Sequence, residues 1–377
     1  MKFAFCLYKY FPFGGLQRDM LQIAEECTNR GHQVDCYVRK WEGDKPEWLN
    51  LYRCPVQAVT NIGKDAVFIR KLHKKLNHSQ YDRVVAFNRI PGCDFYYAAD
   101  PCFRRQIKDR SRMYRLSRRC RYRLNWEKQI FDPGTRTHAI LLTEQQKNFF
   151  QSFYGTPDEQ CHVLPPVLNK ERLQHIADPD AANQFRKEFQ IRDNQIVLLG
   201  IASAFHVKGV DRTLRALAAL PDNSRQKVVY IVAGSGRIAK YIKLAEHLGV
   251  RDLCHFVGGR DDVPYFYAAA DLFIHPARTE TSGTALLEAV AAGLPTITTD
   301  VCGYAPYVEE AEAGFVLSEP FDQQAFNDTL SQLLSAPDQR AQFAANGREI
   351  GRRPEFYQGL QTAAHLIESA HISSNGK

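Results

Sequence analysis

The chain alternates short apolar runs with longer stretches in which apolar residues recur every three or four positions. Its first apolar run covers residues 2–8 (KFAFCLY) and leads to Gly14 and Gly15. In residues 16–32 the apolar side chains fall on one side of a helix, which Gly31 would end. Buried parallel strands are short continuous apolar runs, whereas an amphipathic helix repeats about every 3.6 residues. This part of the chain therefore predicts a strand, a glycine turn and a helix.

The same rhythm returns along both halves of the chain. In the first half, QVDCYVR, RVVAFN and HAILLT predict further strands. The second half starts again at QIVLLGIAS, and its strands alternate with helices predicted at 210–220, 238–248 and 263–270. Such alternation specifies a parallel sheet covered by helices on both faces. We therefore expect an α/β fold of two doubly wound, Rossmann-like domains, at residues 1–168 and 169–353.

The end of the chain and its composition complete this outline. Residues 354–377 are predicted to form a helix that packs back on the N-terminal domain, followed by a disordered tail. Two facing parallel sheets would enclose a cleft, because such sheets bind ligands beyond the carboxyl ends of their strands. With 44% apolar and 24% charged residues, the chain suits soluble domains. It has no run near the roughly 18 apolar residues of a membrane span and no signal peptide, so we expect a cytosolic protein.

The cysteines and histidines show no metal-binding spacing. The ten cysteines lie singly, without a CxxC pair, and the twelve histidines include no HExxH pattern. Cysteines scattered through apolar runs in a cytosolic protein are typical of reduced core residues. The acidic pair in GRDDV resembles a helix cap more than a metal-binding loop. These patterns favour a site without a metal.

One glycine pattern suggests a competing function. Residues Gly234, Gly236 and Ala239 follow a strand and resemble a dinucleotide-binding fingerprint, which would indicate a dehydrogenase. However, they lie in the middle of their domain, and the acid about 20 residues further on, Asp252, precedes a strand instead of ending one. A tight turn is the better interpretation.

The segment HPARTETSGTALLEAVAAGLP carries the strongest signal for chemistry. Glu288 lies inside an apolar helix expected to begin near Ser282, where an acid is costly without a partner. A carboxylate there would accept two hydrogen bonds from a vicinal diol such as that of ribose. Glu280 precedes the helix, and free N–H groups around Gly283 and Thr284 would form an anion site. The alternative is a helix cap and one ordinary surface glutamate.

Four motifs together resemble a known family. ETSGTALLEAVAAGLP is similar to the E-x7-E segment of the retaining glycosyltransferases of family 4, which have two facing Rossmann-like domains, the GT-B fold. VKGVDRTLRAL resembles their Lys-Gly motif, VAGSGR their Gly-x-Gly turn, and YKYFPFGGLQRD their N-terminal Gly-Gly loop, in matching order along nearly the whole chain. FCLYKYFPFGGLQRDM, WEGDKP, YYAAD and VCGYAPYV resemble a narrower group, which adds the first outer-core glucose to an inner-core heptose of lipopolysaccharide.

The resemblance implies a donor site for UDP-glucose, with no cofactor and no metal. Its predicted donor-binding residues are Gly14, Gly15, Arg172, Lys208, Arg260, Glu280, Ser282, Gly283, Thr284 and Glu288. Lys208 would be the main cation at the diphosphate, a role that explains a lysine where the helix dipole repels it. Most of the family has an arginine five residues earlier, where this chain has Ser203. The second cation would be Arg260 or, failing that, Arg172.

The resemblance also makes the reaction retaining. The predicted catalytic residues are Lys208, Glu280, Asp19 and Asp100. A carboxylate nucleophile is common in retaining hydrolases, and Glu280 is a candidate for it. We favour a same-face attack, in which the departing phosphate takes the acceptor proton and Glu280 accepts hydrogen bonds from the donor sugar. Asp19 and Asp100 either contact substrate at the cleft edge or only cap a helix or turn, and Asp100 would orient the acceptor heptose or assist proton removal.

Positive charge is concentrated in residues 104–123, which hold ten cationic residues and one acid, whereas the whole chain carries +7. Read as one helix, residues 103–131 combine this charge with an irregular apolar stripe, which suits an anionic membrane surface. Phosphorylated lipopolysaccharide in the inner leaflet of the bacterial inner membrane would supply both the surface and the acceptor. The predicted docking residues are Arg104, Arg105, Lys108, Arg112, Arg115, Arg118, Arg119, Arg121, Arg123 and Trp126.

Other interpretations of these features stay open. The arginines could stack on RNA or form only a solvated face, although we expect no nucleic-acid partner. The enzyme could use another UDP-hexose or another glycolipid acceptor. An inactive sugar-nucleotide-binding scaffold is the alternative outside the enzymes. The expected protein is a monomeric glucosyltransferase, peripheral on the cytoplasmic face of the inner membrane.

Overall fold

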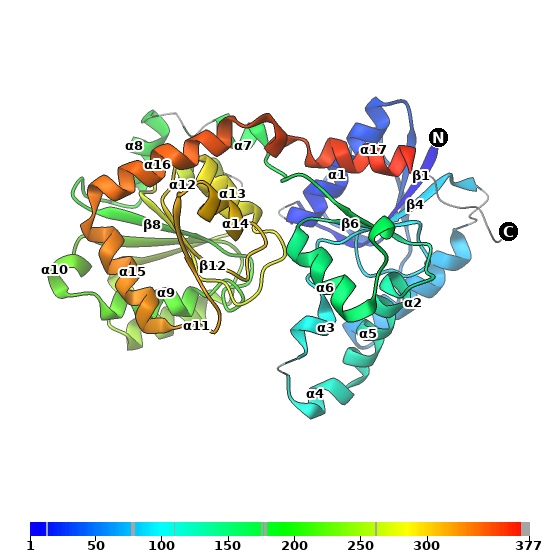
Figure 1. Cartoon of the computed structure of the whole chain (residues 1–377), viewed down its shortest axis with the longest axis horizontal. Helices are drawn as coiled ribbons and strands as arrows, with labels where there is room; N and C mark the ends of the chain where they lie inside the picture. Colours follow the sequence, from blue (N-terminus) through cyan, green and yellow to red (C-terminus); the bar gives the residue numbers. More distant parts are fainter. Residues whose placement is uncertain are drawn as a thin grey trace. The chain divides into compact units, whose positions relative to one another are not determined.

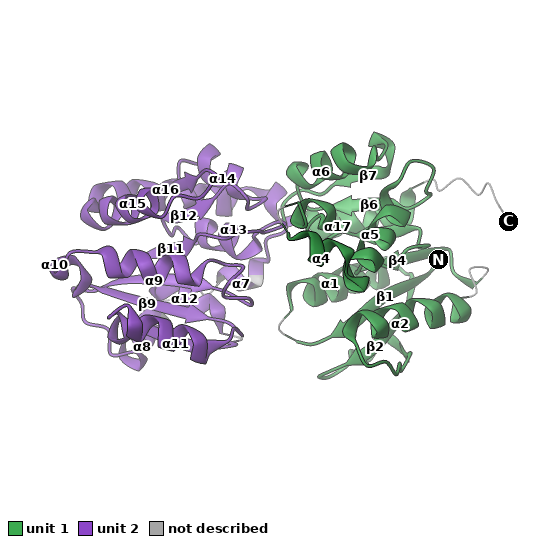
Figure 2. Ribbon diagram, turned by 90° about the horizontal axis from the view of Figure 1, so that it is seen from below, with its two compact units in different colours: residues 1–166, 358–377 green, residues 167–357 purple. Residues whose placement is uncertain are grey.

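The chain forms two compact units, coloured separately in Figure 2. Unit 1 comprises residues 1–166 and 358–377, and unit 2 comprises residues 167–357. The predicted disordered tail, residues 373–377, lies outside the described residues. The computed structural model describes residues 1–12, 14–76, 80–108, 110–174, 176, 179–260 and 262–370 (Figure 1).

Unit 1 is built on a parallel sheet with helices on both faces. In spatial order its strands are β3 (Asn50–Arg53), β2 (Gln33–Trp41), β1 (Lys2–Tyr10), β4 (Arg83–Ala86), β5 (Phe95–Tyr97), β6 (His138–Leu141) and β7 (Cys161–Val163). Its helices include α1 (Gly15–Asn29), α2 (Asn61–Lys75), α3 (Phe103–Gln106), α4 (Arg112–Leu116), α5 (Arg118–Phe131), α6 (Glu144–Tyr154) and α17 (Gly359–Ser369). One apolar layer packs under α1 and α17, and the other packs under α2, α5 and α6.

Unit 2 repeats this arrangement. In spatial order its strands are β10 (Cys254–Gly258), β9 (Val228–Ala233), β8 (Ile196–Ile201), β11 (Leu272–His275), β12 (Thr296–Thr299) and β13 (Gly314–Leu317). Its helices include α7 (Lys170–Gln174), α8 (Pro179–Glu188), α9 (Val210–Ala219), α10 (Asp222–Arg225), α11 (Ile238–His247), α12 (Val263–Ala269), α13 (Thr284–Ala291), α14 (Ala305–Glu310), α15 (Gln323–Ser335) and α16 (Pro337–Arg352). One apolar layer packs under α8, α12, α13, α14 and α16, and the other packs under α9, α11 and α15.

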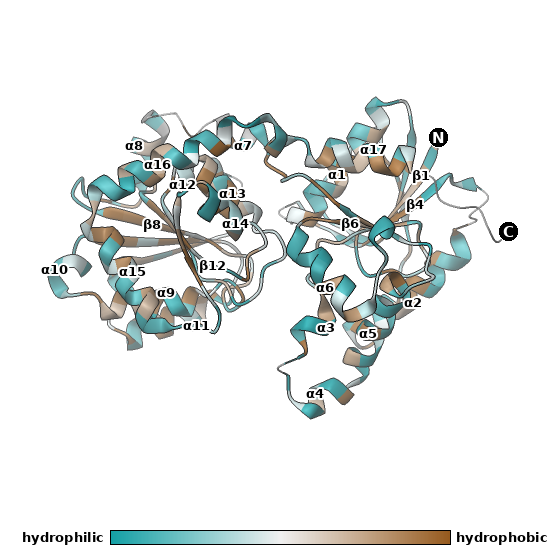
Figure 3. Ribbon diagram, viewed as in Figure 1, coloured by the Kyte–Doolittle hydropathy of each residue, from teal (hydrophilic) through white to brown (hydrophobic). Residues whose placement is uncertain are grey.

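Both units therefore confirm the predicted doubly wound α/β fold. The paired strands within each sheet run parallel. In Figure 3 the strands are mostly hydrophobic, and the helices carry hydrophilic residues. All ten cysteines are buried, which confirms that they are core residues.

The basic stretch at residues 103–131 differs from the predicted single helix. It forms three helices, α3, α4 and α5 (Figure 1). The Ser111 side chain accepts a hydrogen bond from the Tyr114 N–H, and the Ser117 side chain accepts one from the Cys120 N–H. Serine at such a position satisfies the free N–H groups at the start of a helix. The prediction of one continuous helix was wrong because these serines begin new helices.

Candidate active site

Lys208 lies in the turn between β8 and α9 of unit 2. Its Nζ pairs with the carboxylate of Glu280, from the loop that follows β11. The next residue, Gly209, caps α9 with a φ of +72°, and a Cβ there would clash with the carbonyl of Pro276. Glycine is therefore required beside the lysine. Burial lowers the pKa of Lys208 to about 8, so an anionic partner stabilises its charged form.

His275, the last residue of β11, adds a third polar side chain to this pair. Its Nε2 lies 3.4 Å from Glu280 Oε2 and makes no hydrogen bond within the described residues. Burial, followed by the charge of Lys208, holds the pKa of His275 well below its usual range, so the ring is neutral. A buried polar atom without a partner marks a place for a ligand or a water. These three side chains form the polar centre of unit 2.

Two arginines fix the loop that carries Glu280. The Nη atoms of Arg278 donate to the two carboxylate oxygens of Asp211, at 2.8 and 2.7 Å. Arg212 donates to two backbone carbonyls of the loop, at 3.1 and 2.9 Å. Because Asp211 and Arg212 lie in the first turn of α9, which follows Lys208 and Gly209, the same helix start supports the loop and the lysine.

The start of α13 lies where the sequence predicts an anion site, and anion binding there stays a prediction. The helix begins at Thr284, two residues later than expected, and its cap Gly283 has a φ of +89° and no side-chain hydrogen bond. No acidic side chain occupies the first turn, so its free N–H groups have no carboxylate of the helix itself as a partner. Glu280 lies just before the helix and accepts a hydrogen bond from the Thr281 N–H at 3.2 Å. Ser282 is buried beside the free N–H groups, and its carbonyl accepts a hydrogen bond from the Tyr304 N–H at 2.7 Å. This geometry suits a phosphate group.

Glu288 has partners inside unit 2. Arg172 from α7 donates through Nε to Oε1 at 2.6 Å and through Nη2 to Oε2 at 3.1 Å, and the Tyr267 hydroxyl donates to Oε2 at 2.8 Å. The glutamate side chain is only 3% exposed. The sequence predicted that Glu288 needs a partner. It did not predict that this partner is Arg172, which donates two hydrogen bonds. The predicted contact of Glu288 with a ribose diol stays a prediction.

Arg260 also has acidic partners. It holds both carboxylate oxygens of Asp262, at 2.8 and 2.6 Å, and lies 3.4 Å from Glu188. Asp262 is the N-cap residue of α12, as the expected helix cap requires, but its carboxylate binds Arg260 and makes no capping hydrogen bond. Asp261 lies outside the described residues. The role of Arg260 at the diphosphate stays a prediction.

The Gly-x-Gly turn between β9 and α11 is explained by packing. A Cβ on Gly234 would clash with the carbonyl of Ala202, and a Cβ on Gly236 would clash with the ring of Phe205. Gly234 also has a φ of +138°. Both glycines are therefore required by unit 2 itself. This favours a tight turn over a dinucleotide site.

In unit 1 the Gly-Gly turn precedes α1. Gly14 caps the helix without a side-chain hydrogen bond, and the first turn carries no acid. A Cβ on Gly15 would meet no described atom within 4 Å. Packing within the described part of unit 1 therefore does not explain a glycine at position 15. Its predicted place near the donor phosphates stays a prediction.

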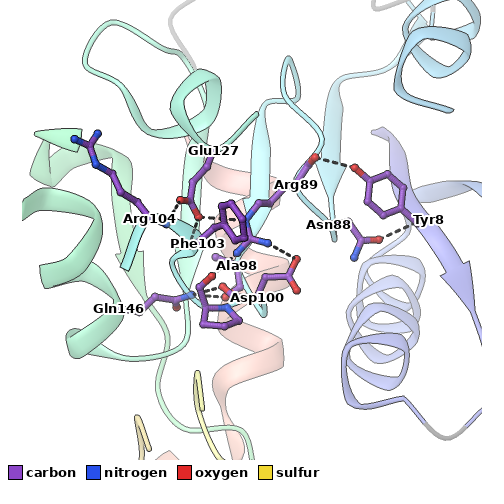
Figure 4. A network of polar contacts seen from close by, with 10 residues as sticks. Tyr8, Asn88, Arg89, Ala98, Asp100, Phe103, Arg104, Glu127 and Gln146 are labelled. Carbon is purple, nitrogen blue, oxygen red and sulfur yellow. Dashed lines mark hydrogen bonds and ion pairs between the residues drawn. The ribbon is translucent and has the colours of Figure 1, made fainter. Parts of the chain in front are cut away.

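Asp19 and Asp100 lie near the carboxyl edge of the sheet in unit 1. Asp19 accepts a hydrogen bond from the Tyr97 hydroxyl at 2.8 Å, at the end of β5. Asp100 follows the same strand, and its Oδ2 lies 3.4 Å from Nη1 of Arg89 (Figure 4). Its side chain is 40% exposed. Parallel sheets commonly bind ligands at this edge. The predicted contact of Asp19 and Asp100 with substrate stays a prediction.

Comparison with known proteins decides the family. The model for Glycosyltransferase Family 4 matches residues 13–172, and the model for Glycosyl transferases group 1 matches residues 182–350. The chain is 41% identical over 365 residues to the lipopolysaccharide glucosyltransferase WaaG of Escherichia coli (strain K12), across 97% of this chain and 98% of that protein. The chain belongs to the WaaG family of glycosyltransferases.

Solved structures agree with this family. The crystal structure of WaaG, a glycosyltransferase involved in lipopolysaccharide biosynthesis, matches with a TM-score of 0.94 and 41% identity, over 98% of this chain and 100% of that chain. The structure of Anabaena Alr3699/HepE in complex with UDP-glucose matches with a TM-score of 0.75 at 18% identity, over 98% and 100% of the chains. The second match concerns the fold alone. The predicted GT-B fold is confirmed.

In this WaaG relative, Trp126 does not belong to a docking surface. Its side chain is 7% exposed and packs in the core beside Ile130 and Phe131, on the inner side of α5. The prediction that it meets a membrane was wrong, because this face of α5 covers the sheet. Seven predicted docking residues are exposed: Arg104, Lys108, Arg112, Arg115, Arg118, Arg119 and Arg121. The other two, Arg105 and Arg123, are half-buried.

Sequence reasoning missed several polar residues of the site. His275 ends an otherwise apolar strand, LFIH, and that position was a usable signal. Arg278 and Asp211 lie 67 residues apart, so no local sequence pattern predicts that they form an ion pair. Tyr267 sits in the short apolar helix α12, where a tyrosine is ordinary. Within the described residues, no group of three or more His, Cys, Asp or Glu side chains is placed to hold a metal ion.

Proposed function

We propose that this protein transfers glucose from UDP-glucose to a heptose of the lipopolysaccharide inner core. The observation that carries the proposal is the 41% identity over 97% of the chain with the lipopolysaccharide glucosyltransferase WaaG of Escherichia coli. The group around Lys208, His275 and Glu280 supports an active enzyme over an inactive scaffold, because its charged and polar atoms converge within unit 2. Another UDP-hexose donor is the alternative that the experiment below tests.

Unit 2 would hold the donor. The Lys208 ammonium and the free N–H groups at Gly283 and Thr284 supply positive charge for the diphosphate. This charge matters most when the bond from the sugar C1 to the phosphate oxygen breaks, because negative charge then grows on UDP. When the diphosphate binds, Lys208 would exchange part of its contact with Glu280 for the phosphate. Glu280 is then available to the hydroxyl groups of the sugar.

The reaction would retain the configuration at C1. The heptose hydroxyl attacks from the face that UDP leaves, the new C1–O bond forms, and the hydroxyl proton passes to the departing phosphate oxygen. Glu280 accepts hydrogen bonds from the donor sugar in this scheme, and the neutral His275 is placed to contact the same groups. In this scheme Glu280 contacts the sugar hydroxyl groups and does not itself attack C1. Fixed cations neutralise the leaving group, so we propose that no metal takes part.

The basic segment, residues 103–131, would dock on the cytoplasmic face of the inner membrane. Its nine predicted docking cations form no ion pair with a described residue, and the seven exposed ones are therefore available to anionic headgroups. Met113 and Leu116 are 85% and 68% exposed among these arginines on α4, and such exposed apolar groups suit insertion between headgroups. No helix in the described ranges is long and apolar enough to cross a membrane. We further propose a monomer without a nucleic-acid partner.

The function is tested by transfer to purified core lipid that ends in heptose. UDP-glucose, UDP-galactose and UDP-N-acetylglucosamine are compared, each with and without EDTA. We expect transfer of glucose that survives EDTA and is slowed about a hundredfold in Glu280→Gln. The matched control is Glu309→Gln, an exposed glutamate on α14, which should remain active. Transfer to a different acceptor, with none to the heptose lipid, would refute the lipopolysaccharide assignment.

A further inference from the structure

Asp100 lies on a loop that buried polar side chains hold in place (Figure 4). Arg89 is buried and reaches three groups at once. Its Nη1 lies 3.4 Å from Asp100 Oδ2, its Nη2 donates to the carbonyl of Pro101, and its Nε donates to Glu127 Oε1 at 3.2 Å. A single guanidinium thus binds both the carboxylate and the backbone of the loop. Its planar fork suits this task better than a lysine ammonium would.

The second anchor is Glu127, a fully buried carboxylate on α5. It accepts hydrogen bonds from the N–H groups of Phe103 and Arg104 at 2.7 and 2.9 Å, and from the Tyr154 hydroxyl at 2.7 Å. The first residues of the basic segment are therefore tied to a residue near its end. Such a buried carboxylate is stable only with this number of partners. Through Arg89, the same carboxylate is linked to Asp100.

The surroundings keep both anchors in place. The Tyr8 hydroxyl on β1 donates to the backbone carbonyl of Arg89 at 2.9 Å, and burial raises the pKa of Tyr8 well above its usual range, so it stays a donor. On the other side of the loop, Gln146 Nε2 donates to the carbonyls of Ala98 and Asp100, at 2.6 and 3.2 Å. Two buried side chains, Arg89 and Gln146, thus donate hydrogen bonds to the loop backbone. What remains exposed is the carboxylate of Asp100.

We propose that Arg89 is a positioning residue: with Glu127 behind it, it holds the Asp100 carboxylate in place for the acceptor sugar. This proposal rests on the proposed function, in which Asp100 contacts the acceptor. One oxygen of Asp100 faces Arg89, and no described residue binds the other, so that oxygen is available to an acceptor hydroxyl. The same network joins the acceptor site to the basic segment. A movement of α5 would therefore change the position of Asp100 through Glu127 and Arg89.

The first test measures anchoring without any activity. Arg89→Lys keeps a buried cation but shortens the fork, so that it no longer reaches Glu127, Asp100 and Pro101 together. In hydrogen–deuterium exchange of the full-length protein, we expect amides in residues 98–104 to exchange about tenfold faster in this variant. The matched control is Arg186→Lys, which changes a half-buried arginine of unit 2 that is paired with Asp271. Unchanged exchange in residues 98–104 overturns the proposal.

The second test asks whether Arg89 acts through Asp100. At saturating UDP-glucose, Arg89→Lys and Asp100→Asn should each lower kcat/KM for the acceptor about tenfold. When UDP-glucose is varied instead, its KM should stay within about twofold of wild type. The double variant should be no worse than Asp100→Asn alone. Losses that multiply would show that Arg89 acts on stability or elsewhere, and would overturn the proposal. A wild-type protein that transfers no glucose refutes the proposed function, while the exchange test still decides the anchoring.

Discussion

The pair between Arg172 and Glu288 should make unit 2 sensitive to the loss of one arginine. In Arg172→Met the carboxylate of Glu288, only 3% exposed, would lose two charge-assisted hydrogen bonds, at 2.6 and 3.1 Å. A buried ion that loses its partner destabilises a protein by roughly 3–5 kcal/mol. Arg172 is itself 18% exposed, so water softens the effect and we expect about 3 kcal/mol, at the low end of that range. For a unit of this size, that corresponds to a fall in melting temperature of about 6–12 °C.

Scanning calorimetry of the purified variants tests this value. The double variant Arg172→Met/Glu288→Gln leaves no unpaired charge and should regain most of the lost stability. The matched control is Arg352→Met, which breaks an exposed ion pair with Glu349 on α16 and should cost less than about 1 kcal/mol. The reasoning is refuted if Arg172→Met melts like wild type, or if the double variant is as unstable as the single one.

Three further predictions concern catalysis, pH and membranes. Glu280→Gln should lower kcat about a hundredfold while UDP affinity, measured by calorimetry, stays within threefold of wild type, roughly the effect of losing one preorganised group; a normal kcat would contradict its role. Because the pKa of Lys208 is about 8 and its charged form binds the diphosphate, UDP affinity should fall as pH rises from 7 to 9.5, and a flat profile would count against this lysine. Met113→Ser/Leu116→Ser should weaken binding to anionic vesicles about tenfold or more in sedimentation assays, and unchanged binding would argue against insertion of α4.

Much of the fold could be predicted because local and long-range signals agree. The apolar runs became the buried strands of two parallel sheets, and the predicted helix starts at Val210, Ile238 and Val263 match α9, α11 and α12. The E-x7-E segment was placed correctly at the start of α13, apart from a shift of two residues caused by the left-handed Gly283. These features depend on period and turn chemistry, which a sequence displays directly.

The basic segment and the buried ion pairs could not be predicted in the same way. In residues 103–131, charge and apolar periodicity suggest one helix. In the structure, Ser111 caps the start of α4 and Ser117 caps the start of α5, so the segment is divided into separate helices. Trp126 is predicted at the membrane because it lies in a basic amphipathic segment, although its face of α5 packs in the core. The partners Arg172 and Glu288 lie 116 residues apart, so only the three-dimensional structure brings them together.

The central claim is that the protein transfers glucose to heptose with retention of configuration at C1. One measurement tests the sugar, the acceptor and the configuration together. UDP-glucose labelled with carbon-13 at C1 is incubated with the purified protein and heptose-terminated core lipid, and the product is examined by NMR. We predict that the label appears in a new α-linked glucose on a heptose of the lipid. Label found only as free glucose, or in a β-linked product, would contradict the account.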